Sequence, residues 1–320
     1  MIMSMRKIRL GLLFIALLMA ACQNAPKKKQ RGDEISLTAG TMWIAVDESF
    51  KPIMEEELQV YHAMYPEATI RPIYCSEVDA INLFLKDSVR FVLANRQLTN
   101  KELESFHSRK FQPQSIRVAV GGLALITNRA NPDSTITVSQ FKDILTGKIA
   151  DWKDLDATSK LGNLQLVFDN PNSGIVHYAI DSLCGGAPLA EKTVKAQKNN
   201  EEVIRYVSQA KDAIGVIGVN WIGEASDTTR LSFNKDVRVM SVSENESTRG
   251  YKPYQAYLAL RQYPLTHDIY ILVNDPRGAL PTGLMTFLTG ERGQRIILKS
   301  GLVPATQPVN IRQVGIKDEF

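Results

Sequence analysis

The chain has few of the residues, and none of the motifs, that mark enzymes. Only 3 of its 320 residues are cysteine and 4 are histidine, and the histidines are scattered without metal-ligand spacing. It contains no Gly-x-Ser-x-Gly elbow, no Walker-type loop and no His-Glu-x-x-His pair. His177 lies four residues after Ser173, but a nucleophile–base pair also needs an orienting group and an oxyanion site. We therefore expect no catalytic centre, metal site or cofactor.

The sequence also lacks repeats, low-complexity tracts and any second hydrophobic span. The apolar run at residues 10–19 is shorter than the roughly 20 residues that span a bilayer. Arg6, Lys7 and Arg9 precede this run, as in the positive region of a signal peptide. We predict that residues 1–21 are a signal peptide.

Cys22 follows the small residues Ala20 and Ala21, at the predicted cleavage point. Residues 19–22 resemble the lipobox of bacterial lipoproteins, which implies that a lipid is attached to Cys22. The alternative is an ordinary signal peptide with an incidental cysteine. Residues 22–34 are polar and predict a lipid-anchored tether, so we expect a periplasmic protein held to the inner or outer membrane.

The net charge of +4 comes from the two leading segments. The signal contributes +3, and the lysines and arginine of residues 27–31 contribute +4, which leaves about −3 for the body. The basic composition is therefore no argument for nucleic-acid binding.

Cys75 and Cys184 are the remaining cysteines. A disulfide and two free thiols both stay open, because two cysteines give no spacing signature. About 299 residues remain after cleavage, more than one hydrophobic core usually serves, so we expect two lobes.

Apolar periodicity predicts alternating strands and helices, which is typical of a parallel α/β sheet. A short strand over 35–39 is expected to end at Gly40, and a helix is expected to begin at Asp47. The further strands expected are 70–74, 91–94, 164–168, 214–219 and 237–242. The further helices expected are 78–85, 101–106, 138–145, 174–183, 201–210 and 280–298.

Residues 116–127 form a long apolar run that is interrupted by Gly121 and Gly122. Such a glycine pair indicates a bend or a close backbone approach. We predict that this strand crosses between lobes and that residues 257–260 and 269–273 return. Lobe I is then 35–118 plus 256–320, and lobe II is 119–255.

Several segments resemble the PstS-like family, the phosphate-binding subunits of ABC phosphate importers. The clearest lies within residues 116–155, where Leu145, Gly147, Lys148, Ile149 and Trp152 follow the family pattern F-x-G-K-I-x-x-W. Weaker resemblances lie in residues 94–99, 213–218 and 283–304. The resemblance implies an α/β, two-lobed periplasmic-binding-protein fold of type II with a ligand cleft between the lobes.

The resemblance also implies that loops after strands supply hydrogen-bond donors to an oxyanion. In lobe I these candidates are Thr41 and Met42 in a first loop, Ser76 before a helix, and Arg96 as a source of positive charge. The alternatives are a tight turn for the first loop and a surface salt bridge for Arg96.

A third loop carries Ser173 and Gly174 at the start of a helix, matching part of the family pattern R-x-x-x-S-G-T. Here Asp169 stands at the arginine position and Ile175 at the threonine position. A carboxylate beside an anion is repulsive unless a cation such as Arg96 offsets it. Ser173 is also expected to be a helix N-cap.

Two functions follow from these observations. The first is a monomeric binding protein that takes phosphate or another small oxyanion and delivers it to an ABC permease by closing its lobes. The second is a family descendant that has lost phosphate binding and serves as an envelope scaffold or sensor, an alternative motivated by Asp169, Ile175 and Glu77.

Overall fold

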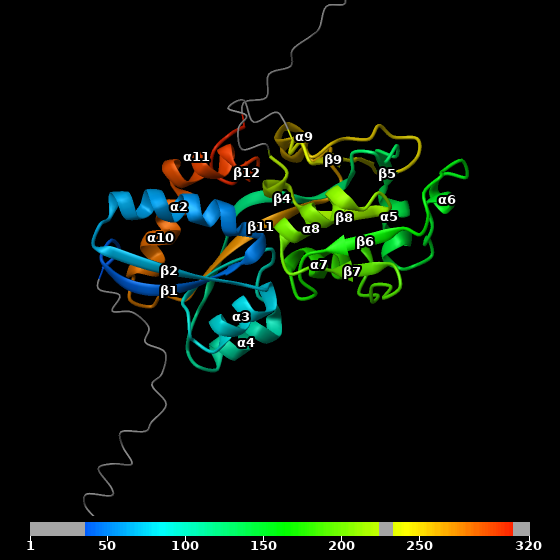
Figure 1. Cartoon of the computed structure of the whole chain (residues 1–320). Coiled ribbons are helices and arrows are strands. Elements are labelled where there is room, and N and C mark those ends of the chain that lie inside the picture. Colours follow the sequence, from blue (N-terminus) through cyan, green and yellow to red (C-terminus); the bar gives the residue numbers. More distant parts are fainter. Residues whose placement is uncertain (1–35, 224–232, 310–320) are drawn as a thin grey trace, which may run out of the picture.

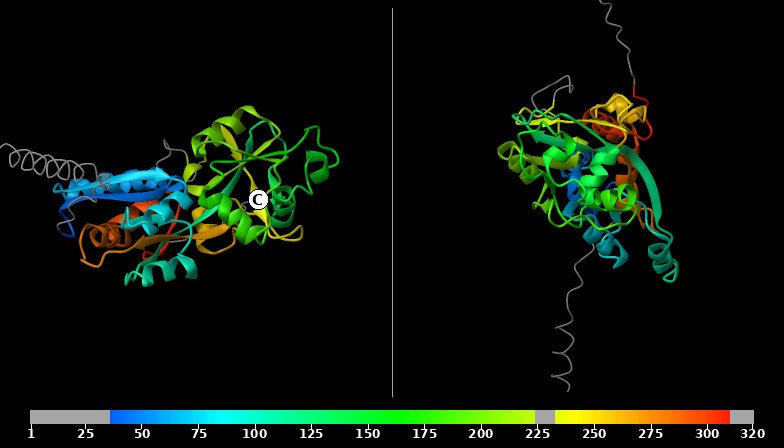
Figure 2. Two further views of the ribbon diagram at one scale, coloured as in Figure 1. Left: turned by 90° about the horizontal axis from the view of Figure 1, so that it is seen from below. Right: turned by 90° about the vertical axis from the view of Figure 1, so that its right-hand side faces the viewer.

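Two α/β lobes lie side by side in the computed structural model, which describes residues 36–223 and 233–309 (Figure 1, Figure 2). The predicted signal peptide, Cys22 and the tether lie outside the described residues. No helix within the described ranges is both long and apolar enough to cross a bilayer.

Lobe I contains residues from both ends of the described chain. Its strands follow the order β2-β1-β3-β11, with β11 antiparallel to β3. Its elements are β1 (Gly40–Asp47), η2 (Glu48–Phe50), α2 (Lys51–Met64), β2 (Ala68–Cys75), α3 (Glu77–Leu85), β3 (Phe91–Ala94), α4 (Asn100–His107), β11 (Thr266–Val273), α10 (Leu280–Thr289), α11 (Glu291–Lys299) and β12 (Val303–Pro304).

Lobe II is built on β8, β6 and β7, which are parallel neighbours in that order. Its elements are β5 (Thr135–Thr137), α5 (Val138–Leu145), α6 (Trp152–Leu155), β6 (Gln165–Phe168), α7 (Gly174–Tyr178), the π-helix η3 (Ala179–Leu183), β7 (Val194–Ala196), α8 (Asn200–Gln209), β8 (Ala213–Gly218), η4 (Val219–Trp221), β9 (Val237–Val239) and β10 (Ser241–Ser243). Helix α9 (Gln255–Ala259) precedes the return to lobe I.

The strand β4 (Gln114–Asn128) belongs to both lobes, as predicted for residues 116–127. It pairs with β11 as far as Gly122 and with β8 from Leu123 onward. A Cβ atom on Gly122 would lie 2.7 Å from the carbonyl oxygen of Leu265, which explains the glycine as a close backbone approach. The residue limits given above for the two lobes stay a prediction.

The motif with the strongest family resemblance has a structural role in lobe II. Trp152 is fully buried, and its indole N–H donates to the carbonyl of Asp212 at 3.0 Å. Gly147 has a φ of 77°, a conformation that favours glycine, and Lys148 pairs with Asp143 at 3.0 Å. These residues hold the loop between α5 and α6 in place.

The strand expected at residues 35–39 is wrong. The first strand starts at Gly40, where the prediction ended it, and runs to Asp47. Residues 41–46 pair along β2 and lie largely in the core, where burial decides the conformation. The glycine therefore begins the strand, with a φ of 119°.

Three later expectations also need correction. The expected strand 237–242 is two strands in separate sheets, β9 and β10. The expected helix 280–298 is two helices that meet at Gly290, whose extended backbone ends one and begins the next. Residues 257–260 lie at the end of helix α9 instead of in a returning strand.

Cys75 and Cys184 are both free thiols. Burial raises the pKa of Cys75 to about 12, and nearby carboxylates act in the same direction. This thiol is therefore protonated and unreactive at neutral pH.

Candidate functional site

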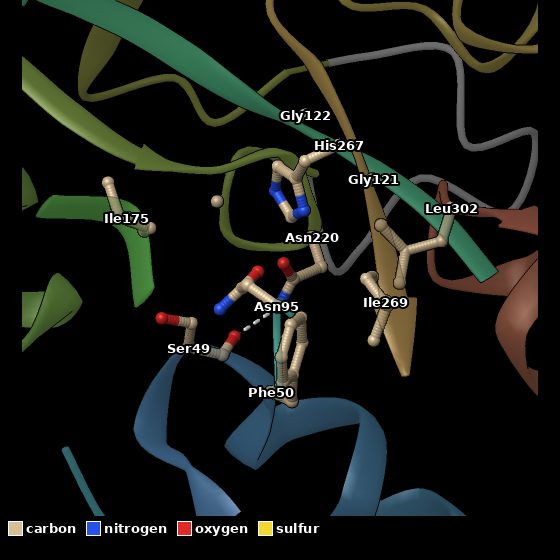
Figure 3. Close-up of a pocket in the computed structure, with 11 residues that line it drawn as sticks. Ser49, Phe50, Asn95, Gly121, Gly122, Ile175, Asn220, His267, Ile269 and Leu302 are labelled. Carbon is tan, nitrogen blue, oxygen red and sulfur yellow. Dashed lines mark hydrogen bonds between the residues drawn. The ribbon is translucent and has the colours of Figure 1, made fainter. Parts of the chain in front are cut away.

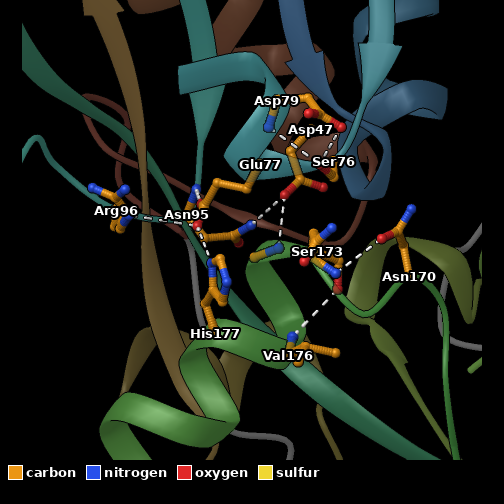
Figure 4. A network of polar contacts seen from close by, with 12 residues as sticks. Asp47, Ser76, Glu77, Asp79, Asn95, Arg96, Asn170, Ser173, Val176 and His177 are labelled. Carbon is orange, nitrogen blue, oxygen red and sulfur yellow. Dashed lines mark hydrogen bonds and ion pairs between the residues drawn. The ribbon is translucent and has the colours of Figure 1, made fainter. Parts of the chain in front are cut away.

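The carboxyl ends of the parallel strands in the two lobes face each other. From lobe I come the residues after β1, β2 and β3, and from lobe II those after β6 (Figure 4). The residues after β8 also lie at this end of the strands. Ligands of open α/β sheets bind at this end of the strands. The polar residues that meet between the lobes are therefore the candidates for a ligand site.

Asp47, at the end of β1, is the centre of this arrangement and is 0% exposed. Its Oδ1 accepts the backbone N–H of Ser49 at 2.8 Å. Its Oδ2 accepts the backbone N–H of Gly174 at 3.0 Å and the side-chain amide of Asn95 at 3.3 Å. Donors from both lobes thus converge on one carboxylate.

The surroundings of Asp47 are acidic. Burial, together with the negative charges of Glu77 and Asp169, raises the pKa of Asp47 to about 7, against the hydrogen bonds from Ser49. Part of the Asp47 population is therefore protonated at neutral pH.

Glu77, the first residue of α3, links the lobes a second time. It is buried and accepts the backbone N–H of Asn95 at 2.7 Å. Its other oxygen lies 3.5 Å from Nδ1 of His177, across the cleft, and 3.7 Å from Nε of Arg96 (Figure 4). The hydrogen bond to Glu77 raises the pKa of His177, although burial opposes it.

Arg96 does not supply its charge to the space around Asp47. Its guanidinium makes a bidentate pair with Glu102, at 2.8 and 2.9 Å, within lobe I. Glu102 and Glu77 thus balance the positive charge of Arg96 that was predicted to face the ligand. The salt bridge named as the alternative is the arrangement observed.

Ser173 is the N-cap of α7, as predicted, and its Oγ accepts the N–H of Val176 at 3.3 Å. Its hydroxyl donates to Asp169 at 2.6 Å, and the amide of Asn200 donates to the same carboxylate at 3.1 Å. Burial raises the pKa of Asp169, against these hydrogen bonds. Asp169 is therefore balanced by its own donors in lobe II and not by Arg96.

Ser76 lies at the cleft end of β2 and caps α3. Its Oγ accepts the N–H of Asp79 at 3.1 Å and donates to the Asp79 carboxylate at 2.7 Å. The hydroxyl is thus committed to the helix start.

Thr41 and Met42 lie at the far end of β1 from the cleft, so the structure does not bring them together with the other candidates. They come six and five residues before Asp47, about 20 and about 16 Å away along the strand. Met42 is 1% exposed and packs in the core. The first cleft loop is instead Asp47–Phe50, which was missed because the strand was expected to end at Gly40.

The lobes are closed on each other. Ser49 accepts through its carbonyl oxygen from the side-chain amide of Asn220 at 2.7 Å and from the indole of Trp221 at 2.8 Å. Tyr178 donates to the carbonyl of Thr266 at 3.1 Å. These cross-lobe bonds tie η2 to η4 and α7 to β11.

A narrow pocket that has no room for a water molecule remains between the lobes (Figure 3). It is lined by Ser49, Phe50, Asn95, Gly121, Gly122, Ile175, Gly218, Asn220, His267, Ile269 and Leu302. Within the described ranges, the buried Ser49 hydroxyl and the Asn95 carbonyl oxygen have no hydrogen-bond partner. Unpartnered buried polar atoms are rare, and here both line the pocket. Burial lowers the pKa of His267 to about 4, so its ring there is neutral.

The family model for the PBP superfamily domain matches residues 33–292. The chain belongs to the PBP superfamily.

Of the described residues, no group of three or more His, Cys, Asp or Glu could hold a metal ion.

Two curated relatives of this PBP superfamily member align with nearly its whole length. It is 22% identical to the phosphate-binding protein PstS of Pseudomonas aeruginosa, over 99% of both chains. It is 24% identical to the phosphate-binding protein PstS of Bacillus subtilis, over 95% of this chain and 96% of the relative. The PstS-like resemblance predicted from the sequence is thus confirmed.

Solved structures support the same fold. A putative phosphate ABC transporter substrate-binding protein with bound phosphate from Clostridium perfringens aligns with a TM-score of 0.68 at 20% identity, covering 83% of this chain and 99% of that one. An ABC-type phosphate transport receptor from Vibrio cholerae aligns with a TM-score of 0.63 at 21% identity, covering 82% and 99%. The predicted two-lobed periplasmic-binding-protein fold is confirmed.

Proposed function

We propose that this chain is a solute-binding protein that holds phosphate or a related small oxyanion between its lobes and delivers it to an ABC permease. The curated relatives and solved neighbours named above are phosphate-binding proteins, which supports this ligand class. The observation that carries the proposal is the convergence of donors from both lobes, Ser49, Asn95 and Gly174, on one anionic group.

The chemistry of these donors suits an oxyanion. Two are backbone N–H groups at the starts of helical turns, and the third is a neutral amide, so they bind a group that carries only acceptor oxygens. Ser49 and Asn95 belong to lobe I and Gly174 to lobe II, so the three donors come together only when the lobes close. Ligand binding and closure are therefore the same event in this proposal.

The proposal includes export and anchoring. Residues 1–21 act as the signal peptide, and lipid on Cys22 holds the body to the periplasmic face of a membrane through residues 22–34. The protein works as a monomer that meets the permease, and it does not bind nucleic acid. We propose no catalytic role for it: His177, which follows Ser173 by four residues, pairs with Glu77.

Phosphate titration of the full chain in detergent, followed by calorimetry and thermal melting, tests the proposal. We expect saturable heat and a higher melting temperature. Asn95→Ala should weaken binding at least about tenfold, because it removes a donor. Asn82→Ala on the exposed face of α3 is the matched control. If millimolar phosphate produces no heat and no melting shift, phosphate is rejected as the ligand and the scaffold or sensor function is favoured.

A further inference from the structure

The carboxylate of Asp47 already occupies a position between the lobes that is built for an anion. Both of its oxygens are used: one accepts from Ser49, the other from Gly174 and Asn95. The hydroxyl of Ser49, which is 1% exposed and lines the neighbouring pocket, has no partner in the described part of the chain. The protein's own carboxylate therefore occupies the three donors, and the Ser49 hydroxyl is left without an acceptor in that part of the chain.

An oxyanion and the Asp47 carboxylate cannot share this position. Glu77 and Asp169 already face Asp47 with negative charge. Arg96 and His177 are both held on Glu77, and Arg96 is also paired with Glu102. A ligand placed beside Asp47 would meet like charge and, of the donors named above, would find free the Ser49 hydroxyl alone. The pocket has no room even for a water molecule.

We propose that Asp47 is a built-in competitor for the ligand: its Oδ2 occupies the donors of Gly174 and Asn95 when the site is empty, and an oxyanion binds by displacing it. The inference rests on the proposed function and adds a residue that sets the affinity. Asp47 also closes the lobes without ligand, because its donors come from both of them.

A ligand binds only to molecules in which Asp47 has left its position. The apparent affinity is therefore the affinity of the vacant site multiplied by the fraction of such molecules. If Asp47 fills its position in about 99% of molecules, the ligand binds about 100-fold more weakly than to the vacant site. A side chain fixed on the protein competes at a high effective concentration, whereas the ligand must be supplied from solution.

Asp47→Ser separates the two tasks of this residue. A serine still accepts the backbone N–H of Ser49, because serine and aspartate both cap such turns. Its hydroxyl is too short to reach Gly174 and Asn95, so the anion position becomes vacant. Asp156→Ser is the matched control: Asp156 is exposed and also accepts a backbone N–H two residues on, that of Thr158, at 2.8 Å.

The experiment compares the parent chain, D47S and D156S, each full length in detergent. Calorimetric titration with inorganic phosphate measures affinity, and hydrogen–deuterium exchange of the peptide containing Gly174 measures closure. We expect D47S to bind phosphate at least about tenfold more tightly than the parent. The Gly174 peptide of D47S should exchange faster without phosphate and slowly with it, and D156S should match the parent.

The outcomes separate this inference from the proposed function. If the parent binds phosphate and D47S binds equally or more weakly, Asp47 is not a competitor, although the proposed function stands. If only D47S binds phosphate, the competitor is confirmed and transport by the parent is refuted. Binding by neither protein overturns both.

Discussion

The two faces of the cleft carry opposite hydrogen-bonding roles. Across the interface lobe I presents acceptors, the carboxylates of Asp47 and Glu77 and the carbonyl of Ser49. Lobe II presents donors, among them the backbone N–H of Gly174 and the indole of Trp221. Closure therefore satisfies groups on both lobes before any ligand arrives. A ligand of this site must compete with an interface that is already matched.

The largest effect is expected at Glu57, a buried acid of lobe I whose carboxylate accepts no hydrogen bond from the described residues. Glu57, in α2, is 0% exposed, and neither carboxylate oxygen has a partner within the described ranges. Burial raises its pKa from 4.5 to about 9. The folded protein therefore holds a proton that the unfolded chain loses, so stability is full below pH 4.5 and falls as pH rises toward 9.

Glu57→Gln should remove this dependence. Between pH 5 and 8 the parent should lose roughly 3 to 4 kcal/mol of unfolding free energy that the variant keeps. Urea unfolding across this pH range measures it, and Glu55→Gln on the exposed side of α2 is the control. Equal slopes in the parent and Glu57→Gln would mean that Glu57 gains a donor in solution, as the cleft acids do.

Gly174→Ala is the direct way to break the match between the two faces. A Cβ atom at this position would collide with the side chain of Asn95 and come within 2.8 Å of the Asp47 carboxylate. The lobes could not close, and phosphate binding should weaken on the order of 100-fold in calorimetry. Gly223→Ala, where nothing lies within 4 Å of the added atom, should bind as the parent does. Normal affinity in Gly174→Ala would place the ligand away from this interface.

Trp221→Phe tests a single donor of lobe II. It removes the indole N–H that Ser49 accepts, while the bond from Asn220 remains. One neutral hydrogen bond contributes about 1 kcal/mol, so the affinity for phosphate should fall about fivefold in the same titration. Trp43→Phe, at an exposed position, controls for the loss of an indole. An unchanged affinity would show that the Asn220 bond alone holds this side of the cleft.

The smallest effect is expected at the pair that His177 makes with Glu77. The hydrogen bond to Glu77 raises the pKa of His177, so its contribution to closure is full below pH 6.5 and is lost above the raised value. In Glu77→Gln, the pKa of His177 should fall back toward 6.5, measured by NMR titration of its ring protons. The exposed His107 is the internal reference. A titration of His177 that does not move would exclude this cross-lobe contact in solution.

The elements were easier to predict than the site. Strand β3 and helix α5 have the predicted bounds, because each is a short apolar pattern between clear breaks. The N-cap at Ser173 was also predicted, since that signal is local. The prediction ends the first strand at Gly40, although the strand begins there. It therefore places the first loop at Thr41, whereas the structure has it at Asp47.

The cleft contacts could not be predicted for a physical reason. The bond between Gly174 and Asp47 joins residues 127 positions apart, and only the closed arrangement of two lobes brings them together. A salt bridge of Arg96 was open as an alternative, but local sequence patterns do not distinguish pairing with Glu102 from contact with a ligand. Local patterns report helix and strand, whereas the site depends on how the lobes meet.

The position of β11 in the sheet has a consequence for folding kinetics. This strand lies between β3 and β4, so the sheet of lobe I stays incomplete until residues 266–273 have been synthesised. The parallel strands of lobe II all lie within residues 165–218 and need no such distant partner. Because pairing between distant segments is slow, lobe II should reach its native topology first. The assembly of lobe I then sets the rate at which the cleft first forms.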